Sequence, residues 1–266
     1  YTLLHKHAHD GDDEGLDSGL GMGLDVDAVD AFGATPIMHA AQEGHLSIVR
    51  RLCWRGADVT VGDLAVGATV LHLAAKGEHC SVLKALSSAW LDVDVRDHEN
   101  ETPLFDAVEN GQLPATKTLI ALGADCLINA GADVHTGNTN GGRTALHFAA
   151  CQGGDEMIGA LLAGGAGIDA LDDCGATPLM LAATEGQLSV VKALLSAGAN
   201  VNFVIGVTGR TPLHWAAIGG REDAVDAILS AGGAKDTFDN NGDIPLMWAC
   251  KGGHLSVIKA LLSAGA

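Results

Sequence analysis

Short apolar segments alternate along the chain with glycine-rich polar links. Within residues 186–199, apolar side chains recur every three or four positions, at Leu188, Val191, Leu194 and Leu195. This spacing predicts a short helix with one apolar face, ended by Gly198, which tolerates a left-handed conformation. Another apolar block, residues 177–183, precedes it. The pattern therefore predicts pairs of short helices joined by tight turns.

The first block of each pair recurs through the chain. Its copies begin at Thr35, Thr69, Thr102, Thr144, Thr177, Thr211 and Ile244, with start-to-start spacings of 34, 33, 42, 33, 34 and 33 residues. Threonine is a good helix N-cap, and the proline that usually follows it suits the first helical turn. One such unit leaves an apolar face uncovered, so stability requires that neighbouring units stack.

These repeats resemble the ankyrin-repeat family, whose signature is a Thr-Pro-Leu-His-x-Ala-Ala helix start on a period of about 33 residues. The resemblance implies one all-α domain over residues 1–266, a solenoid of seven to eight helix-turn-helix units with β-hairpin-like fingers. Residues 1–33 are expected to be a decayed capping repeat whose glycine-rich middle frays. An insertion at about 125–142 explains the longest interval. Six glycines are expected at equivalent inter-helix turns: Gly44, Gly111, Gly153, Gly186, Gly220 and Gly253.

Composition limits the partners. The chain has 15 basic and 33 acidic residues and a formal net charge of −18. Nucleic-acid binding needs clustered Lys and Arg, so a nucleic-acid partner is not expected. The charge leaves open a basic protein partner or solubility alone. No apolar run of about 18 residues occurs, so no membrane span is expected. Six scattered cysteines without a CxxC spacing favour a reducing intracellular compartment, whether cytoplasm, nucleus or an organelle.

No catalytic motif stands out. The sequence lacks a GxSxG elbow, a phosphate-binding GxxxxGK[ST] loop and a cysteine in the context of a catalytic thiol, so neither enzyme activity nor a cofactor is expected. The resemblance assigns His5, His72, His147 and His214 to backbone hydrogen bonds, and His45, His79 and His254 to inter-helix turns. On a strand His5, His7 and His9 would share a face, but a helix separates them, and no metal site is expected.

By the resemblance, the residue four positions after each repeat start faces a concave groove. Along the chain this groove position reads His39, Leu73, Asp106, Phe148, Leu181, Trp215 and Trp248. Its last four members form an apolar run, which Ile218, Phe203 and Phe238 would extend. Exposed apolar stripes usually mark interfaces, although the rings could instead pack against neighbouring fingers. Asp106 and Glu109 belong to a polar half of the same groove, which is either a second contact surface or a solvated face.

We therefore expect a non-catalytic protein-binding scaffold or adaptor, whose partner carries a basic stretch and an apolar stretch. Two alternatives are a structural subunit of a large permanent assembly and the targeting arm of a longer enzyme or channel. Because no polar capping unit follows Ala266, we expect that the chain continues or that its end docks on a partner. The start at Tyr1, without an initiator methionine, suggests a processed form or a piece of a longer protein.

Overall fold

A computed structural model describes residues 2–87, 91–123 and 141–266. Sixteen α-helices and no β-strand occur among these residues, which confirms the predicted all-α repeat architecture. The described fingers are tight hydrogen-bonded loops and not strand hairpins. The chain divides into two compact units, residues 1–125 and 126–266. The expected insertion at about 125–142 lies almost wholly outside the described residues.

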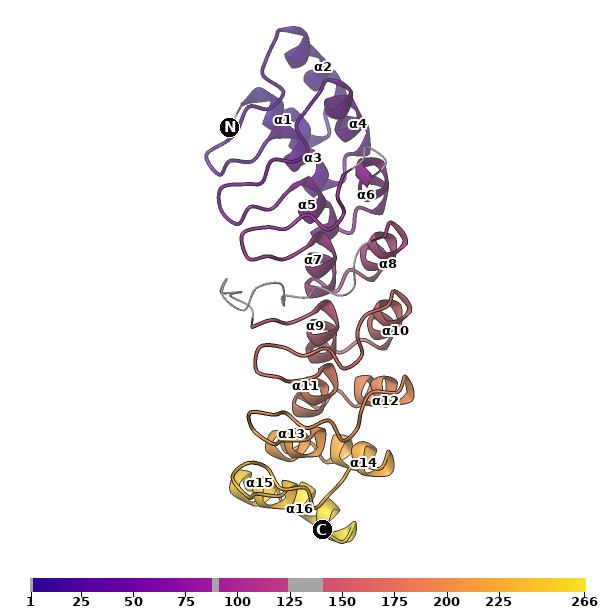
Figure 1. The fold of residues 1–266 in the computed structure, drawn as a ribbon. Coiled ribbons are helices and arrows are strands. Elements are labelled where there is room, and N and C mark those ends of the chain that lie inside the picture. The colour runs from indigo at the N-terminus through magenta and orange to yellow at the C-terminus, as the bar shows by residue number, and fades with distance from the viewer. Residues whose placement is uncertain (1, 88–90, 124–140) are drawn as a thin grey trace. The chain divides into compact units, whose positions relative to one another are not determined.

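Each unit consists of helix pairs whose members form an inner and an outer row (Figure 1). In unit 1 the inner helices are α1 (Leu3–Asp10), α3 (Pro36–Glu43), α5 (Val70–Lys76) and α7 (Pro103–Glu109). Its outer helices are α2 (Asp13–Gly21), α4 (Leu46–Trp54), α6 (Cys80–Ser87) and α8 (Leu113–Ala121). Each helix contacts its pair mate and the next helix of its own row, as the stacking of incomplete units requires.

Unit 2 repeats this arrangement. Its inner helices are α9 (Ala145–Gln152), α11 (Pro178–Glu185), α13 (Pro212–Gly219) and α15 (Pro245–Gly252). Its outer helices are α10 (Asp155–Ala163), α12 (Leu188–Ser196), α14 (Glu222–Ser230) and α16 (Leu255–Ser263). The core lies between the two rows, where Leu179, Ala182 and Val191 are fully buried. Alanine on the inner helices lets neighbouring backbones approach closely.

Local sequence sets the ends of the helices. The Thr177 hydroxyl accepts a hydrogen bond from the amide of Met180, and Pro178 opens α11. Gly186 ends the helix with φ 78°. All six predicted turn glycines lie outside the helices and have positive φ, so that prediction is confirmed. In the repeat that starts at Thr69, the equivalent residue is Glu78, which adopts φ 62° without being glycine.

The first repeat is better formed than expected. We expected residues 15–23 to fray, but α2 is a nine-residue helix over most of that segment. Asp12 caps it by accepting the Gly15 amide, and Leu16 is fully buried. A side chain at Gly19 would come within 2.9 Å of Leu4, so glycine here permits close packing against α1. Tertiary burial thus outweighs the low helix propensity of glycine.

Histidines join successive repeats at two positions. The motif histidine lies three residues after the start of its repeat. Its Nδ1 accepts a hydrogen bond from the threonine that begins the repeat, and its Nε2 donates one to a carbonyl of the next finger. His147 Nε2, for example, lies 3.0 Å from the Ala176 oxygen. A second donor precedes six of the eight outer helices and bonds a carbonyl of the preceding repeat, at His45, His79, Gln112, Gln187, Arg221 and His254. The backbone roles expected for these histidines are therefore observed.

Candidate partner-binding surface

In the repeats that start at Thr35 and Ile244, the side chain at the groove position faces a finger aspartate nine residues earlier in the chain. Oδ1 of Asp239 accepts the amides of Asn241 and Asp243, which closes the finger turn. Its Oδ2 accepts the indole Nε1 of Trp248 at 3.0 Å. In unit 1, Asp30 likewise accepts His39 Nε2 at 3.0 Å. A side-chain donor at the groove position thus ties an inner helix to its own finger.

Trp248 is held among charges. The Arg210 guanidinium lies 4.2 Å from the centroid of its ring, and Lys251 Nζ lies 4.7 Å from it. Such cation–π contacts contribute about 0.5–1 kcal/mol when exposed and more when desolvated. The ring is half-buried. The surface at Trp248 is therefore an aromatic plane flanked by two cations, not a purely apolar patch.

Trp215 is placed differently. It packs on a buried cluster of Ala176, Met180, Leu181 and Ile205, which Phe203 and Cys151 also cover. Its indole Nε1 is buried and receives no hydrogen-bond partner within the described residues. The sequence left open whether the rings pack against neighbouring fingers, and Trp215 does so, because side chains of its own finger and of the preceding inner helix pack against the ring.

The other predicted residues are dispersed. Leu181 is buried, while Phe148 and Ile218 are half-buried. Phe148 has the Arg143 guanidinium 5.9 Å from its ring centroid, and the Ile218 carbonyl accepts His254. Phe238 is 66% exposed. The structure thus brings Leu181, Trp215 and Phe203 together but holds Trp248 in a separate network.

Exposed apolar side chains lie on two adjoining fingers of unit 2. The prediction from the groove position included Phe238 but neither Val204 nor Val207. Val207 is 85% exposed, and Val204 and Phe238 also face solvent. The Asn240 amide donates to the Thr208 carbonyl at 2.9 Å, which joins the two fingers. We call Val204, Val207 and Phe238 the finger patch. Val207 was missed because it occupies a turn, where an isolated valine carries no periodic signal.

The polar residues predicted in unit 1 belong to an acidic cluster. Asp97 and Glu101 lie on the finger before α7, and Asp106 and Glu109 on α7 itself. Asp106 is fully buried and Glu109 is exposed. Burial, with further contributions from Asp97 and Glu109, raises the pKa of Asp106 to about 7, although Lys76 opposes that rise. Burial and the same neighbouring charges raise the pKa of Glu101 to about 7.

A second polar cluster gathers His5, Asp30 and His39, whose ligand-type atoms lie within 4.8 Å of one another. Hydrogen bonds of the fold engage these groups. His5 donates through Nε2 to the Ala34 carbonyl and accepts at Nδ1 from Thr2, while Asp30 closes its finger and accepts His39. The contacts give this cluster a structural role.

The segment with three alternating histidines forms the predicted helix. His5, His7 and His9 contact different partners along α1. His7 Nδ1 lies 2.8 Å from an oxygen of Asp12, and His9 Nδ1 lies 3.6 Å from an oxygen of Glu43. The three imidazoles therefore contact separate partners, as expected for alternating residues on a helix.

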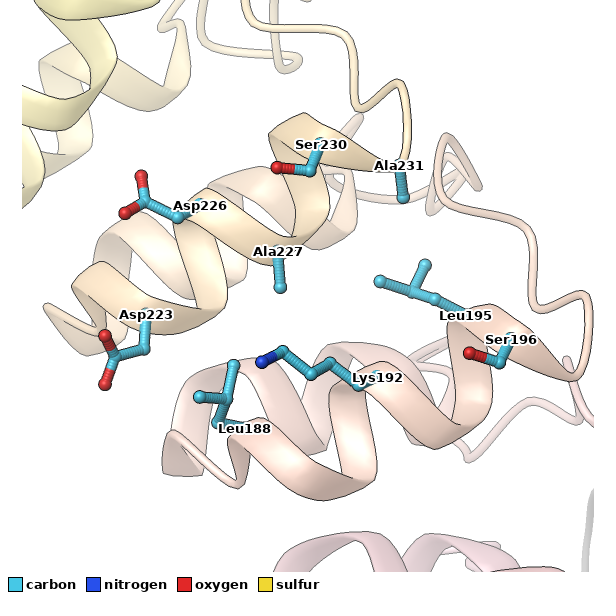
Figure 2. A pocket seen from close by; sticks show the side chains of 9 residues that line it. All are labelled: Leu188, Lys192, Leu195, Ser196, Asp223, Asp226, Ala227, Ser230 and Ala231. Carbon is cyan, nitrogen blue, oxygen red and sulfur yellow. The ribbon is translucent and has the colours of Figure 1, made fainter.

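Other features were not anticipated. Trp54 at the end of α4 is 83% exposed, and Phe32 and Leu64 face solvent on adjacent fingers of unit 1. A shallow hollow of about 480 Å³ lies between α12 and α14. Figure 2 shows Leu195 and Ala227 facing the space between these helices. No helix among the described residues is both long and apolar enough to cross a membrane.

Comparison with known proteins places these features in a family. The family model described as ankyrin repeats (3 copies) matches residues 4–97, 55–130, 124–205 and 203–266. The chain belongs to the ankyrin-repeat family. An ankyrin array is a protein-binding scaffold, so the partner implied by this fold is another protein.

Curated relatives carry similar arrays in larger proteins. The chain is 29% identical over 155 residues to a transient receptor potential cation channel subfamily A member 1 homolog of Caenorhabditis elegans, covering 58% of this chain and 12% of the relative. It is 32% identical over 177 residues to a putative palmitoyltransferase of Danio rerio, covering 66% and 26%. It is 29% identical over 168 residues to an E3 ubiquitin-protein ligase of Arabidopsis thaliana, covering 63% and 30%. The match thus spans less than a third of each of these relatives.

Proposed function

We propose that this chain is a non-catalytic scaffold that recognises a partner protein through its fingers and inner helices. The observation that carries the proposal is the finger patch, because large apolar side chains exposed on adjoining loops usually mark an interaction site. Half-buried Trp215 and Trp248 lie on the helices that follow these fingers and supply the residue type most enriched among interface hot spots.

Charge adds specificity. The acidic cluster of unit 1 suits a basic stretch of the partner, whereas the finger patch of unit 2 suits an apolar stretch. Exposed Glu109 is the member that a partner contacts first, and it acts chiefly on the association rate. Asp106 is buried, so it acts through the field of the cluster and not by direct contact.

The absence of catalysis is part of the proposal. Burial raises the pKa of the Cys53 and Cys151 thiols, which favours the unreactive protonated form. The motif histidines engage both ring nitrogens in backbone and threonine contacts, which leaves them unsuited to act as general bases. Any enzymatic or channel activity would then belong to segments outside this array.

A second candidate is the targeting arm of a longer protein. The observation that favours it is the coverage of the relatives, since the matched array makes up 12%, 26% and 30% of a channel homolog, a putative palmitoyltransferase and a ubiquitin ligase. This candidate uses the same binding surface and differs in what the array is attached to. The sequence of the full-length transcript distinguishes it from a free-standing adaptor.

The test begins with affinity capture by the wild-type chain and identification of the bound protein by mass spectrometry. Phe238→Ser is then expected to weaken binding of that protein at least about tenfold, the scale of a hot spot. Its melting temperature should hardly change, because the side chain is mostly exposed. Leu171→Ser, at a half-exposed position on an earlier finger of the same unit, is the matched control and should bind normally.

Trp215→Leu separates packing from recognition. Leucine fills the groove position at Leu181, so this variant should keep the fold while losing the indole surface. We expect weaker partner binding and a modest loss of stability. Normal binding by both Phe238→Ser and Trp215→Leu would overturn the proposed surface. A chain that elutes only as a large assembly would favour the structural-subunit alternative.

A further inference from the structure

Three outer helices of unit 1 carry charge of one sign. Helices α4, α6 and α8 contain Arg50, Arg51, Lys84 and Lys117 and no acidic residue, although the chain has 33 acidic and 15 basic residues in all. The acidic cluster lies on the other side of this unit, on α7 and the finger before it (Figure 1). From α4 to α8, unit 1 thus presents a basic surface on its outer row and an acidic one on its inner side.

Trp54 lies at the end of α4 and is 83% exposed. The equivalent positions of the other six repeats are serine or alanine, at Ser88, Ala121, Ala163, Ser196, Ser230 and Ser263. The repeat architecture therefore does not require an indole here, and leaving one in water is unfavourable. The next residue, Arg55, is likewise replaced by uncharged residues in the other repeats, and its guanidinium lies 5.5 Å from the centroid of the Trp54 ring.

Further cations lie beside this indole. Arg50 and Trp54 are four residues apart and so share one face of α4. Lys84 occupies on α6 the position that Arg50 occupies on α4, and these two helices are in contact. Arg50, Arg55 and Lys84 are exposed, and none of them forms an ion pair with a residue that the structure describes. We call Arg50, Trp54, Arg55 and Lys84 the outer patch.

Folding accounts for part of the basic charge but not for the outer patch. Arg51 pairs with Asp13 and Asp17 of α2, so it joins α4 to the preceding repeat. Basic residues near a helix C-terminus also offset its partial negative charge, which gives Lys84 and Arg55 a structural role. Neither effect involves Arg50 or explains an indole left in water.

We propose that the outer patch binds an acidic segment of a partner protein that carries an apolar side chain beside its carboxylates. The carboxylates bind the three cations, and the apolar side chain packs on the Trp54 ring. Tryptophan and arginine are enriched among interface hot spots, and opposite charge sets orientation and speeds association. This surface lies on the outer row, whereas the finger patch lies on fingers, so the scaffold gains a second binding surface that does not depend on the first.

An anionic lipid bilayer would present the same charge, but two observations favour a protein. A bilayer meets a whole face of the molecule, and the formal net charge of −18 opposes its approach. A surface that lies on a membrane buries a broad apolar face. On α4, α6 and α8, which the structure describes throughout, Trp54 is the only large apolar side chain that is exposed.

The experiment measures binding of a labelled synthetic peptide, made of glutamate pairs separated by leucine, to the full chain by fluorescence anisotropy. Wild type should bind, and binding should weaken as salt screens the charges. Arg50→Glu combined with Lys84→Glu should weaken binding at least about tenfold, because like charges then face the peptide. Lys192→Glu combined with Lys259→Glu makes the same charge change at exposed, equivalent positions of unit 2, and this control should bind normally.

Trp54→Ser separates the apolar anchor from the charge. Serine is the residue that most other repeats carry at this position, so the variant should fold with an unchanged melting temperature. It should weaken binding of the glutamate–leucine peptide at least about fivefold, the scale of a contributing interface residue. Binding of a glutamate–glycine peptide should stay the same, because that peptide has no side chain to pack on the indole.

Several results would overturn the proposal. Wild type that does not bind the peptide even at low salt, or normal binding by the Arg50→Glu and Lys84→Glu double variant, would remove the outer patch. Cosedimentation with vesicles of phosphatidylserine and phosphatidylcholine that Trp54→Ser abolishes would assign the patch to a lipid surface. Self-association that the double variant abolishes would assign it to a second copy of the chain. Phe238→Ser should bind the peptide normally, so failure of the outer patch and failure of the proposed finger surface are distinguishable.

Discussion

The indole nitrogen of Trp248 donates a hydrogen bond to Oδ2 of Asp239 at 3.0 Å, while Arg210 lies over the ring of the same tryptophan. The ring is therefore part of the fold as well as of the candidate surface. Burial by itself would raise the pKa of Asp239, but the hydrogen bonds that it accepts from Asp243, Asn241 and Trp248 outweigh burial and lower that pKa. One tryptophan thus links a finger, an inner helix and the preceding repeat's arginine.

Trp248→Phe should cost about 1–2 kcal/mol of unfolding free energy, because it removes a hydrogen bond to a charged acceptor and weakens the cation–π contact. Trp215→Phe is the matched control, since the indole of Trp215 makes no hydrogen bond among the described residues. Both changes remove the same atoms. Urea unfolding should therefore show a larger loss for Trp248→Phe, and equal losses would contradict the structural role of the Asp239 bond.

Glu78→Gly should stabilise the protein. Glu78 has φ 62° at a turn where other repeats carry glycine, and the left-handed conformation costs a non-glycine residue about 1 kcal/mol. We expect a gain of roughly that size, reduced by the greater unfolded-state entropy of glycine. Glu185→Gly lies within α11 and should destabilise by about 0.5–1 kcal/mol. A loss of stability in both variants would refute the strain at Glu78.

The buried motif histidines should lower stability as the pH drops below about 6.5, the ordinary pKa of histidine, whereas Glu101 and Asp106, with pKa raised to about 7, act in the opposite direction. Burial lowers the pKa of His72, His147 and His214, so these rings are neutral in the folded state. Below about pH 6.5 the unfolded chain binds protons that the folded chain does not, and each such histidine contributes up to about 1.4 kcal/mol per pH unit. The contribution is complete above that pH and is lost as the pH falls towards the lowered folded pKa.

His147→Gln tests this linkage. At about pH 7.5 it should be less stable than wild type, because a buried imidazole with two bonded nitrogens is lost. Between about pH 6.5 and 5 its stability should decline less steeply, since one titrating group has gone. Denaturant titrations across that interval measure the slope. An unchanged slope would show that His147 titrates alike in the folded and the unfolded chain.

Much of the helical framework could be predicted from local sequence. Thr177, Pro178 and Gly186 define a helix by capping, ring geometry and backbone freedom, all of which act within a few residues. The role of His147 followed from the resemblance to the ankyrin-repeat family, whose motif places a histidine at this position. The segment around α2 was misjudged, since its helix depends on burial of Leu16 and on close approach at Gly19, which propensity does not register.

The candidate site could be predicted only in outline. The spacing of the repeats placed Trp215 and Trp248 at equivalent positions, yet their environments differ. One packs on a cluster that includes Ile205, and the other bonds Asp239 beneath Arg210. Sequence periodicity predicts the side of the helix on which a residue lies. Whether its ring is buried or exposed depends on the side chains that the fingers and the neighbouring helix pack against it.

The sequence by itself determined the family, the helix pairs, their turns and the histidines that join them, because these depend on contacts that repeat at a fixed spacing. Only the tertiary structure decided that Lys76, Glu101, Asp106 and Glu109 share one acidic cluster, and that Val207 and Phe238 lie on joined fingers. Those groups come from different repeats or from non-periodic turns. Their meeting depends on how the helix pairs stack within each unit and on burial, which together set charge and exposure.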